Sequence, residues 1–226
     1  MRWVTGEDVA TTEQAAAEFI AAHLAQAISE RGRATLAVSG GRTPWAMFER
    51  LAALNVAWAH VHLFQVDERI APENDAARNW TQLIASPLAA RIPAAHRHPM
   101  PVGIADAAAA AAAYAATLVE ACGEPPVLDV VHLGLGDDGH TASLFQGDPL
   151  LEERARDVGV SGPRAGLRRL TLTLPAIDRA RCIVWLALGA GRQRAVAQLF
   201  AGDRAISASR VSRERATAFT DPAAAP

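Results

Sequence analysis

The chain contains no lysine: apart from histidine, all of its basic side chains are arginine, and its 226 residues carry a net charge of −2. A nucleic-acid surface needs a clustered basic excess, so this balance argues against one. Alanine runs such as 106–116 accompany the missing lysine, and we attribute both to biased base composition rather than to an arginine-rich binding motif. Any site that could have used lysine must here use arginine, whose planar fork is longer and differently aimed.

Cysteine and long apolar runs are also scarce. The two cysteines, Cys122 and Cys182, lie 60 positions apart in apolar surroundings, which favours buried thiols over a disulfide or a metal site. No apolar run approaches the ~20 residues of a membrane span, and residues 1–14 lack the charged leader and apolar segment of a secretory signal. We therefore expect a soluble, cytoplasmic protein without a membrane partner, as a monomer or a small homo-oligomer.

The chain shows no internal repeat, low-complexity linker or clear domain boundary, so a single domain over 1–226 is expected. Hydrophobic periodicity and propensity predict helices that alternate with short apolar strands. The helices are expected over 11–31, 44–54, 79–88, 104–122 and 192–202, and the strands over 34–39, 60–67, 127–136, 168–174, 181–189 and 216–221. This alternation predicts an α/β fold, a mainly parallel, doubly wound, Rossmann-like sheet with helices on both faces.

Polar segments follow three of the predicted strands. They read "SGGRTP" at 39–44, "DERIAPENDAARNW" at 67–80 and "GDDGHTAS" at 136–143. In open parallel sheets, ligands bind beyond the carboxyl ends of the strands. We therefore expect the three segments to lie on one rim and to form the functional site.

The first segment is suited to an anion. Two glycines let the backbone approach a ligand, and the amides at the start of the following helix donate hydrogen bonds. The residues proposed to bind the anion are Ser39, Gly40, Gly41, Arg42 and Thr43. Because the spacings of a Walker loop and of a dinucleotide fingerprint are absent, the alternative is a plain turn between strand and helix.

The second segment begins with Asp67, Glu68 and Arg69. Alone, these residues are typical of a solvated strand end with an internal ion pair. Asn79 lies further along, where it would cap a helix or hold a loop in shape.

The third segment crowds Asp137, Asp138 and His140 among glycines. If residues 140–145 form the first turn of a helix, its dipole disfavours a histidine cation and leaves a neutral base. Either aspartate would orient the ring and stabilise the imidazolium that forms. The alternative is a histidine that only caps its own turn. No second histidine or cysteine stands at metal-ligand spacing, and Ser143 lacks the nucleophile elbow of serine hydrolases.

At these motifs the chain resembles the 6-phosphogluconolactonase family. The resemblance rests on the three rim segments, the last extended to "GLGDDGHTASLF", and on "RLTLTLPAI" and "ALGAGRQRAV" nearer the C-terminus. It implies hydrolysis of 6-phospho-D-glucono-1,5-lactone to 6-phosphogluconate, a step of the pentose phosphate pathway, without metal or organic cofactor. Gln146 and Ser207 depart from the family, because proline is common at both positions.

The resemblance also assigns roles by position. It makes His140 the general base and Arg69 an active-site arginine, and it gives phosphate contacts to the 39–43 loop and to Arg169. Where the family carries a lysine, this chain offers Arg192 or Arg194, and we select Arg192. Asp138 and Asp67 are expected to complete the catalytic set, whereas Arg154, Arg156 and Arg164 are expected to be solvated.

Two other functions are compatible with the same residues. Glucosamine-6-phosphate deaminases share the fold and the aspartate-glycine-histidine turn, and an enzyme of that type would use Asp67 to abstract a proton. A non-catalytic sugar-phosphate sensor is the third hypothesis, although no helix-turn-helix or basic region flanks the domain.

Overall fold

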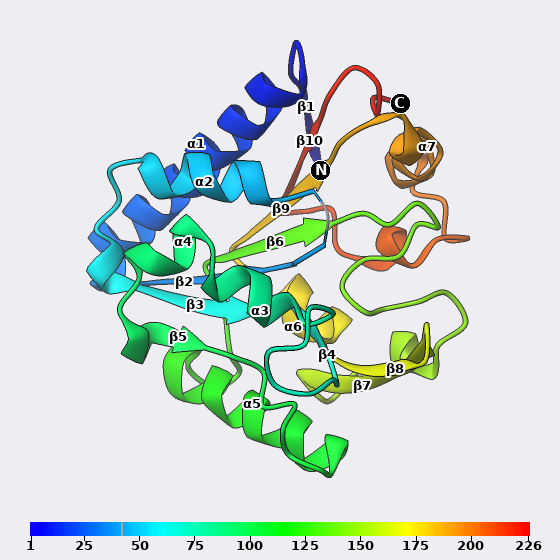
Figure 1. Ribbon diagram of the computed structural model, residues 1–226. Helices are drawn as coiled ribbons and strands as arrows, with labels where there is room; N and C mark the ends of the chain where they lie inside the picture. Colours follow the sequence, from blue (N-terminus) through cyan, green and yellow to red (C-terminus); the bar gives the residue numbers. More distant parts are fainter. Residues whose placement is uncertain (42) are drawn as a thin grey trace.

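A seven-stranded parallel sheet forms the centre of the computed structural model, which describes residues 1–41 and 43–226 (Figure 1). All six neighbouring pairs in this sheet run parallel. In spatial order the strands are β1 (Arg2–Thr5), β10 (Ala216–Thr220), β9 (Cys182–Ala187), β6 (Val130–Gly134), β2 (Ala34–Val38), β3 (Val61–Gln65) and β5 (Arg97–His98). The predicted α/β fold is confirmed, and the only strands of this sheet that the sequence analysis misses are the short edge strands β1 and β5.

Helices cover both faces of the sheet, and a separate apolar core lies under each set. Figure 1 shows α1 and α2 on one side and α5 on the other. The first core is covered by α1 (Val9–Arg31), α2 (Trp45–Ala53), α3 (Asn79–Ile84) and α4 (Pro87–Arg91), and the second by α5 (Ala107–Cys122), α6 (Leu174–Asp178) and α7 (Gln193–Ala201). Short 3-10 turns connect them: η1 (Trp58–His60), η2 (Ala94–His96), η3 (Pro149–Glu152), η4 (Ala190–Arg192) and η5 (Ser207–Arg210).

Two helix boundaries differ from prediction for local reasons. Helix α1 begins earlier than expected because the Asp8 carboxylate accepts the Thr11 amide at 2.7 Å and the Thr11 hydroxyl accepts the Asp8 amide at 3.0 Å, a reciprocal cap. The helix predicted over 79–88 is two helices. Proline disfavours helical geometry in the residue before it, and Ser86 is accordingly extended and caps α4, which starts at Pro87.

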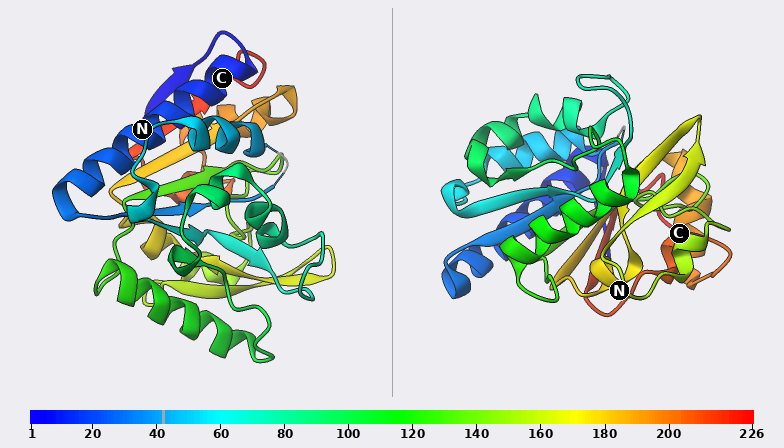
Figure 2. Two further views of the ribbon diagram at one scale, coloured as in Figure 1. Left: turned by 60° about the vertical axis from the view of Figure 1, so that its left-hand side comes forward. Right: turned by 90° about the horizontal axis from the view of Figure 1, so that it is seen from below.

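A second, three-stranded antiparallel sheet packs against the second core. Its strands are β4 (Asp67–Arg69), β8 (Leu167–Leu172) and β7 (Val158–Arg164), with β8 in the middle. The strand predicted over 60–67 therefore divides between two sheets, the strand predicted over 168–174 leaves the parallel sheet, and β7 is not predicted. Strands β7 and β8 form a hairpin whose tip stands at the edge of the molecule (Figure 2).

Three expectations concern the chain as a whole. Both cysteines are free, with Cys182 buried and Cys122 half-buried, and burial raises their thiol pKa values to about 12 and about 11 respectively. None of the helices in the described residues is both long and apolar enough to cross a membrane. The single domain over 1–226, the cytoplasmic location and the oligomeric state stay predictions.

Candidate active site

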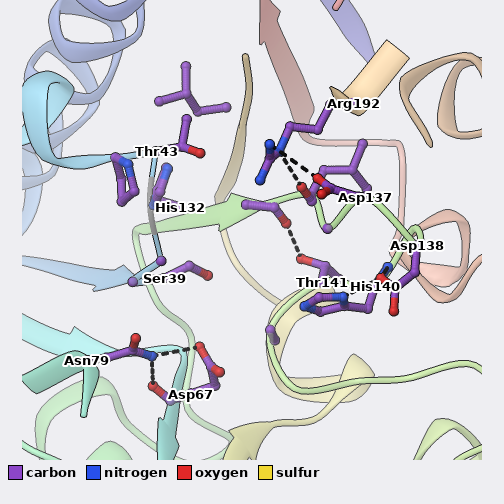
Figure 3. Close-up of a pocket in the computed structure, with 18 of the residues that line it drawn as sticks. Ser39, Thr43, Asp67, Asn79, His132, Asp137, Asp138, His140, Thr141 and Arg192 are labelled. Carbon is purple, nitrogen blue, oxygen red and sulfur yellow. Dashed lines mark hydrogen bonds and ion pairs between the residues drawn. The ribbon is translucent and has the colours of Figure 1, made fainter. Parts of the chain in front are cut away.

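A cavity of about 410 Å³ opens beyond the carboxyl ends of β2, β3 and β6, a size within the range of small-molecule sites. All three polar segments contribute to its wall, so they share one rim as expected. The candidate residues that line it are Ser39, Gly40, Gly41, Thr43, Asp67, Arg69, Asp138, His140, Arg169 and Arg192. Figure 3 shows several of them around the opening. Arg42, the remaining candidate, lies outside the described residues.

Two positions in the loop after β2 require glycine, one for space and the other for its backbone conformation. A Cβ at Gly40 would lie 2.2 Å from the Asn79 side-chain oxygen, and Gly41 has φ +107°, where only glycine is unstrained. The Ser39 amide donates to the His132 carbonyl at 3.1 Å, which anchors the loop to β6. The Ser39 hydroxyl is buried without a hydrogen-bond partner in the described structure. It is therefore available to a ligand.

Strand β4 buries the acidic pair that the sequence analysis assigns to a solvated strand end. Glu68 is 0% exposed and Asp67 is 6% exposed. The Glu68 carboxylate accepts the amides of Asn79 and Trp80, both at 2.7 Å, and so fixes the start of α3. The Asp67 carboxylate accepts the Ser143 hydroxyl at 2.6 Å. The solvated interpretation is wrong because these acids satisfy donors from other elements instead of water.

Asn79 connects α3 to the cavity wall. Its side-chain nitrogen, Nδ2, donates to the Asp67 backbone carbonyl at 3.0 Å (Figure 3). Its side-chain oxygen accepts a hydrogen bond from the Arg69 guanidinium. Asn79 therefore ties the start of α3 to β4 and orients Arg69. It is the first residue of α3 and not its N-cap, which is Arg78.

His140 contacts Asp138, and this distinguishes the two candidate aspartates. The Nδ1 atom of His140 lies 2.5 Å from Asp138 Oδ1, which also accepts the His140 amide at 3.1 Å. Partial burial alone would raise the pKa of Asp138, but hydrogen bonds and charge from His140, with a further hydrogen bond from Arg164, hold this pKa below its usual value. The carboxylate is thus fixed on the Nδ1 side of the imidazole.

The helix predicted over 140–145 is wrong. Thr141 and Leu144 instead form an isolated antiparallel bridge, and Ala142 between them has a positive φ of 50°. The Thr141 hydroxyl donates to the Gly134 carbonyl at 2.8 Å and closes the loop back onto β6. The helix dipole invoked behind His140 is therefore absent, and the histidine is held by Asp138 and by packing on Phe145, 4.7 Å away between ring centroids.

Asp137 lies near Arg192 instead of His140. The Arg192 guanidinium is 3.2 Å from the Asp137 carboxylate and donates to the Leu135 carbonyl at 3.2 Å (Figure 3). Arg194 is exposed on α7 and is not among the described residues that line the cavity. Of the two arginines considered for the family's lysine position, Arg192 is the one at the cavity.

Arg169 enters the cavity from β8. Its guanidinium lies 5.2 Å from the Phe145 ring centroid, and its Nε is buried without a hydrogen-bond partner in the described structure. Burial lowers the pKa of Arg169; the negative charge of Asp67 opposes this shift, and the nearby cations Arg69 and Arg164 add to it. A half-buried cation with an unused donor is well suited to an anionic ligand.

Sequence reasoning misses Arg164. Its Nη2 lies 2.6 Å from the second carboxylate oxygen of Asp138, and its guanidinium lies 4.6 Å from the Phe145 ring centroid. The side chain of Arg164 is exposed, as expected, but its pairing with Asp138 is not foreseen. Arg154 and Arg156 are also exposed, and each pairs with a nearby glutamate. The usable signal was the glycine and proline residues around Arg164, namely Gly162, Pro163 and Gly166, because these residues mark turns.

His132 is a second residue that sequence reasoning passes over. It is 1% exposed on β6 and lines the cavity beneath the 39–43 loop. Neither ring nitrogen has a hydrogen-bond partner in the described structure, and the ring packs edge-on against Phe48 at 5.3 Å. Burial lowers the pKa of His132 to about 3, so this imidazole is neutral near neutral pH.

The cavity thus combines an imidazole–carboxylate pair with several cations and an open backbone loop. Such a set can take a proton from water, stabilise a developing negative charge and bind an anionic substituent. Among the described residues, no group of three or more histidine, cysteine, aspartate or glutamate side chains could hold a metal ion.

Comparison with known proteins gives a consistent result. Residues 7–220 match the family of glucosamine-6-phosphate isomerases and 6-phosphogluconolactonase. The chain is 40% identical over 188 residues to 6-phosphogluconolactonase of Synechocystis sp., covering 80% of this chain and 78% of that protein. It is 38% identical over 218 residues to 6-phosphogluconolactonase of Rhizobium meliloti, covering 93% and 92%. A crystal structure of a 6-phosphogluconolactonase from Shewanella baltica matches with a TM-score of 0.86 at 27% identity, covering 98% of this chain and 97% of that one.

Proposed function

The chain belongs to the glucosamine-6-phosphate isomerase/6-phosphogluconolactonase family, and we propose that it hydrolyses 6-phospho-D-glucono-1,5-lactone to 6-phospho-D-gluconate. The observation that carries the proposal is the single cavity shared by the His140–Asp138 pair, Arg69 and the 39–43 loop. A lactone ester needs a base for water and a cation for the oxyanion, and a sugar phosphate needs an anion site.

His140 acts as the general base. Its Nδ1–H donates to Asp138, 2.5 Å away, which leaves Nε2 to take a proton from a water molecule as that water attacks C1 of the lactone. The tetrahedral intermediate then collapses, the bond from C1 to the ring oxygen breaks, and the ring oxygen receives the proton from Nε2. The resulting carboxylic acid releases a proton to solvent. A positioned general base contributes roughly 10²–10⁴-fold to the rate.

Arg69 stabilises the negative charge that develops on the C1 oxygen. Asn79 holds its guanidinium in the cavity wall, so the donor needs little reorganisation when that charge appears. The same charge argument favours a lactone over an amino sugar, because an arginine is a poor neighbour for a cationic amine. Asp67 is engaged by the Ser143 hydroxyl and by Asn79, and we assign it the support of this wall.

The phosphate binds to donors in the cavity wall. Its donors are the loop amides with Ser39 and Thr43, together with Arg169 and Arg192, all of which line the cavity. Arg42 belongs to the same proposal on sequence grounds alone. Because arginine supplies a planar fork, Arg192 can replace a lysine at this position and still pair with an anion.

A coupled assay tests the function directly. Glucose-6-phosphate dehydrogenase supplies fresh lactone, and lactone loss is followed with and without the protein. A rate well above spontaneous hydrolysis supports the proposal, and an unchanged rate refutes it. The alternative deaminase or isomerase would release ammonia from glucosamine 6-phosphate, so the same preparation is incubated with that substrate. Ammonia release without lactonase activity would replace the proposed function with this alternative.

A further inference from the structure

The β7–β8 hairpin has a local geometry that aims one side chain at the base. The pairing of the two strands shifts register between Ser161 and Arg164, a bulge that re-aims the end of β7. The Gly162 amide within this bulge donates to the Asp148 carboxylate at 2.9 Å, which ties the hairpin to the loop below it. Residues 165–166 both have positive φ, 50° and 78°, as the tight two-residue turn requires. Arg164 therefore leaves the hairpin from a fixed backbone.

The contacts of Arg164 end on the imidazole–carboxylate pair. Asp138 Oδ2 accepts a hydrogen bond from Arg164 Nη2 at 2.6 Å, and Asp138 Oδ1 lies 2.5 Å from His140 Nδ1. The Arg164 guanidinium also lies over the Phe145 ring at 4.6 Å, and His140 packs against that same ring at 4.7 Å. The carboxylate is thus held between two partners that share an aromatic neighbour, so rotation away from His140 would break the ion pair as well.

We propose that Arg164 is a positioning residue: it holds Asp138 against His140 and lowers the affinity of the His140–Asp138 pair for a proton. This inference rests on the proposed function for its effect on turnover. The cation offsets part of the charge on Asp138 and opposes the imidazolium. Without Arg164, Asp138 stabilises the protonated ring more strongly, and the base is blocked at a higher pH.

Other charges face the same pair from neighbouring elements and do not replace Arg164. Each is engaged by a different partner or lies in a different part of the wall. These groups are Arg169 over Phe145, Asp137 near Arg192, and Asp67 with Arg69 on β4. Of the charged side chains in the described residues, Arg164 is the one that forms an ion pair with Asp138 besides His140. Loss of Arg164 should therefore change the electrostatic environment of His140 more than that of the other residues in the cavity.

The test uses the 226-residue chain, three variants at Arg164 and one control variant. R164M keeps an apolar stem over Phe145 without the charge, R164Q keeps a polar end, and R164K keeps the charge. R156Q is the matched control, because Arg156 is another arginine of this region whose exposed ion pair is with Glu153. We expect R164M and R164Q to lower kcat roughly 10-fold, part of the contribution of the base, with KM changed less than about 3-fold. The acidic limb of their kcat/KM profile moves to higher pH, R164K restores its position, and R156Q leaves both quantities unchanged.

A second readout separates this inference from the proposed function. The pH titration of the His140 ring is followed by NMR in the wild type, R164M and R164Q, and the signal is assigned with H140Q. A higher midpoint in the neutral variants supports the inference even if the lactonase assay fails. An unchanged midpoint and acidic limb in whichever neutral variant remains folded, or an equal shift in R156Q, overturns it. Because Arg164 is half-exposed and exposed ion pairs contribute little to folding, we expect both variants to fold.

Discussion

The seven-stranded sheet and the three-stranded sheet contribute different chemistry to one cavity. Loops at the carboxyl ends of the large sheet supply Ser39, Gly40, Gly41 and Thr43 together with the proposed base, His140. The small sheet supplies cations: Arg69 from β4 and Arg169 from β8 line the cavity, and Arg164 at the end of β7 pairs with Asp138 of its wall. In the proposed reaction, the large sheet therefore positions the group that takes a proton, and the small sheet positions cations for the developing negative charge.

This difference follows from how each sheet is buried. The parallel strands have helices on both faces, so β2 and β9 are buried at every residue and are apolar except for Thr35 of β2, whose hydroxyl donates to the Asp129 carboxylate. Strand β8 places Leu170 and Leu172 in the core, whereas Arg169 on its other face lines the cavity, next to the buried Thr171 on that same face. A strand with one face toward a cavity can present a charged side chain there, and a sheet covered by helices on both faces can do so only beyond its strand ends.

The largest expected effect is at His140, the proposed general base that the large sheet positions. We expect H140A to lower kcat by roughly 10²–10⁴-fold, or about 3–5 kcal/mol, because no group would remain to take the proton from water. The fold and substrate binding should be retained. Steady-state kinetics and a thermal melt measure both effects.

The matched control for this prediction is H60A, an exposed histidine in η1 at the opposite end of the sheet. It should leave kcat unchanged. Near-wild-type turnover in H140A would mean that another residue accepts the proton and that the large sheet does not position the general base.

The next largest expected effect is the loss of Arg69, which the small sheet positions. R69Q should lower kcat by roughly 10²-fold, the usual loss for one oxyanion donor, because glutamine is shorter and uncharged. The melting temperature should change little. R50Q serves as the control, since Arg50 pairs with Glu13 on the far helices. A large loss of thermal stability in R69Q with kcat preserved would show that Arg69 supports Asn79 and does not act on substrate.

The same contrast explains what the sequence could predict. Buried parallel strands are short apolar runs between turn residues, and β2, β6 and β9 fall within their predicted ranges for that reason. Helix α5 is likewise found at Ala107–Cys122, inside the predicted range of 104–122, because its alanines favour helix and Asp106 caps it.

The rest depended on information that periodicity does not carry. Strand β7 contains a glycine and a proline at a bulge, so its alternation is broken, and the ion pair between Arg164 and Asp138 could not be predicted. The turn at 140–145 has the composition of a helix start. Its shape is fixed by tertiary contacts, including the Ser207 hydroxyl, which donates to the Leu144 carbonyl at 2.6 Å. The choice of Asp138 over Asp137 likewise depends on the direction in which a tight turn points adjacent side chains.

We expect acid to lower the free energy of unfolding through His132, which lies on β6 of the large sheet. Its folded-state pKa of about 3 lies below the ordinary value of 6.5, so the unfolded chain binds more protons between these values. The stability contributed by neutral His132 is therefore present above pH 6.5 and is lost as pH falls toward 3. For one such group the free energy of unfolding drops by about 2 kcal/mol between pH 7 and pH 5.

Urea unfolding at the two pH values measures this drop in the wild type and in H132L. The variant should lose about 2 kcal/mol less than the wild type over this interval. His62, whose pKa burial lowers to about 4, acts in the same direction in both proteins, so the difference isolates His132. H60L, at an exposed histidine, should follow the wild type. Equal pH dependence in H132L and wild type would mean that His132 does not titrate on unfolding.

The smallest predicted effect lies at the hairpin tip of the small sheet. Ala165 has φ 50°, a left-handed conformation that strains a residue with a Cβ, and Gly166 has φ 78° with open space where a Cβ would stand. A165G should raise the free energy of unfolding by about 0.5 kcal/mol, since relief of strain slightly exceeds the added chain entropy. G166A should lower it by about 1 kcal/mol. Thermal melts of the two variants should shift in opposite directions by roughly 1–4 °C. A stabilising G166A would mean that the turn differs from the one that aims Arg164 at Asp138.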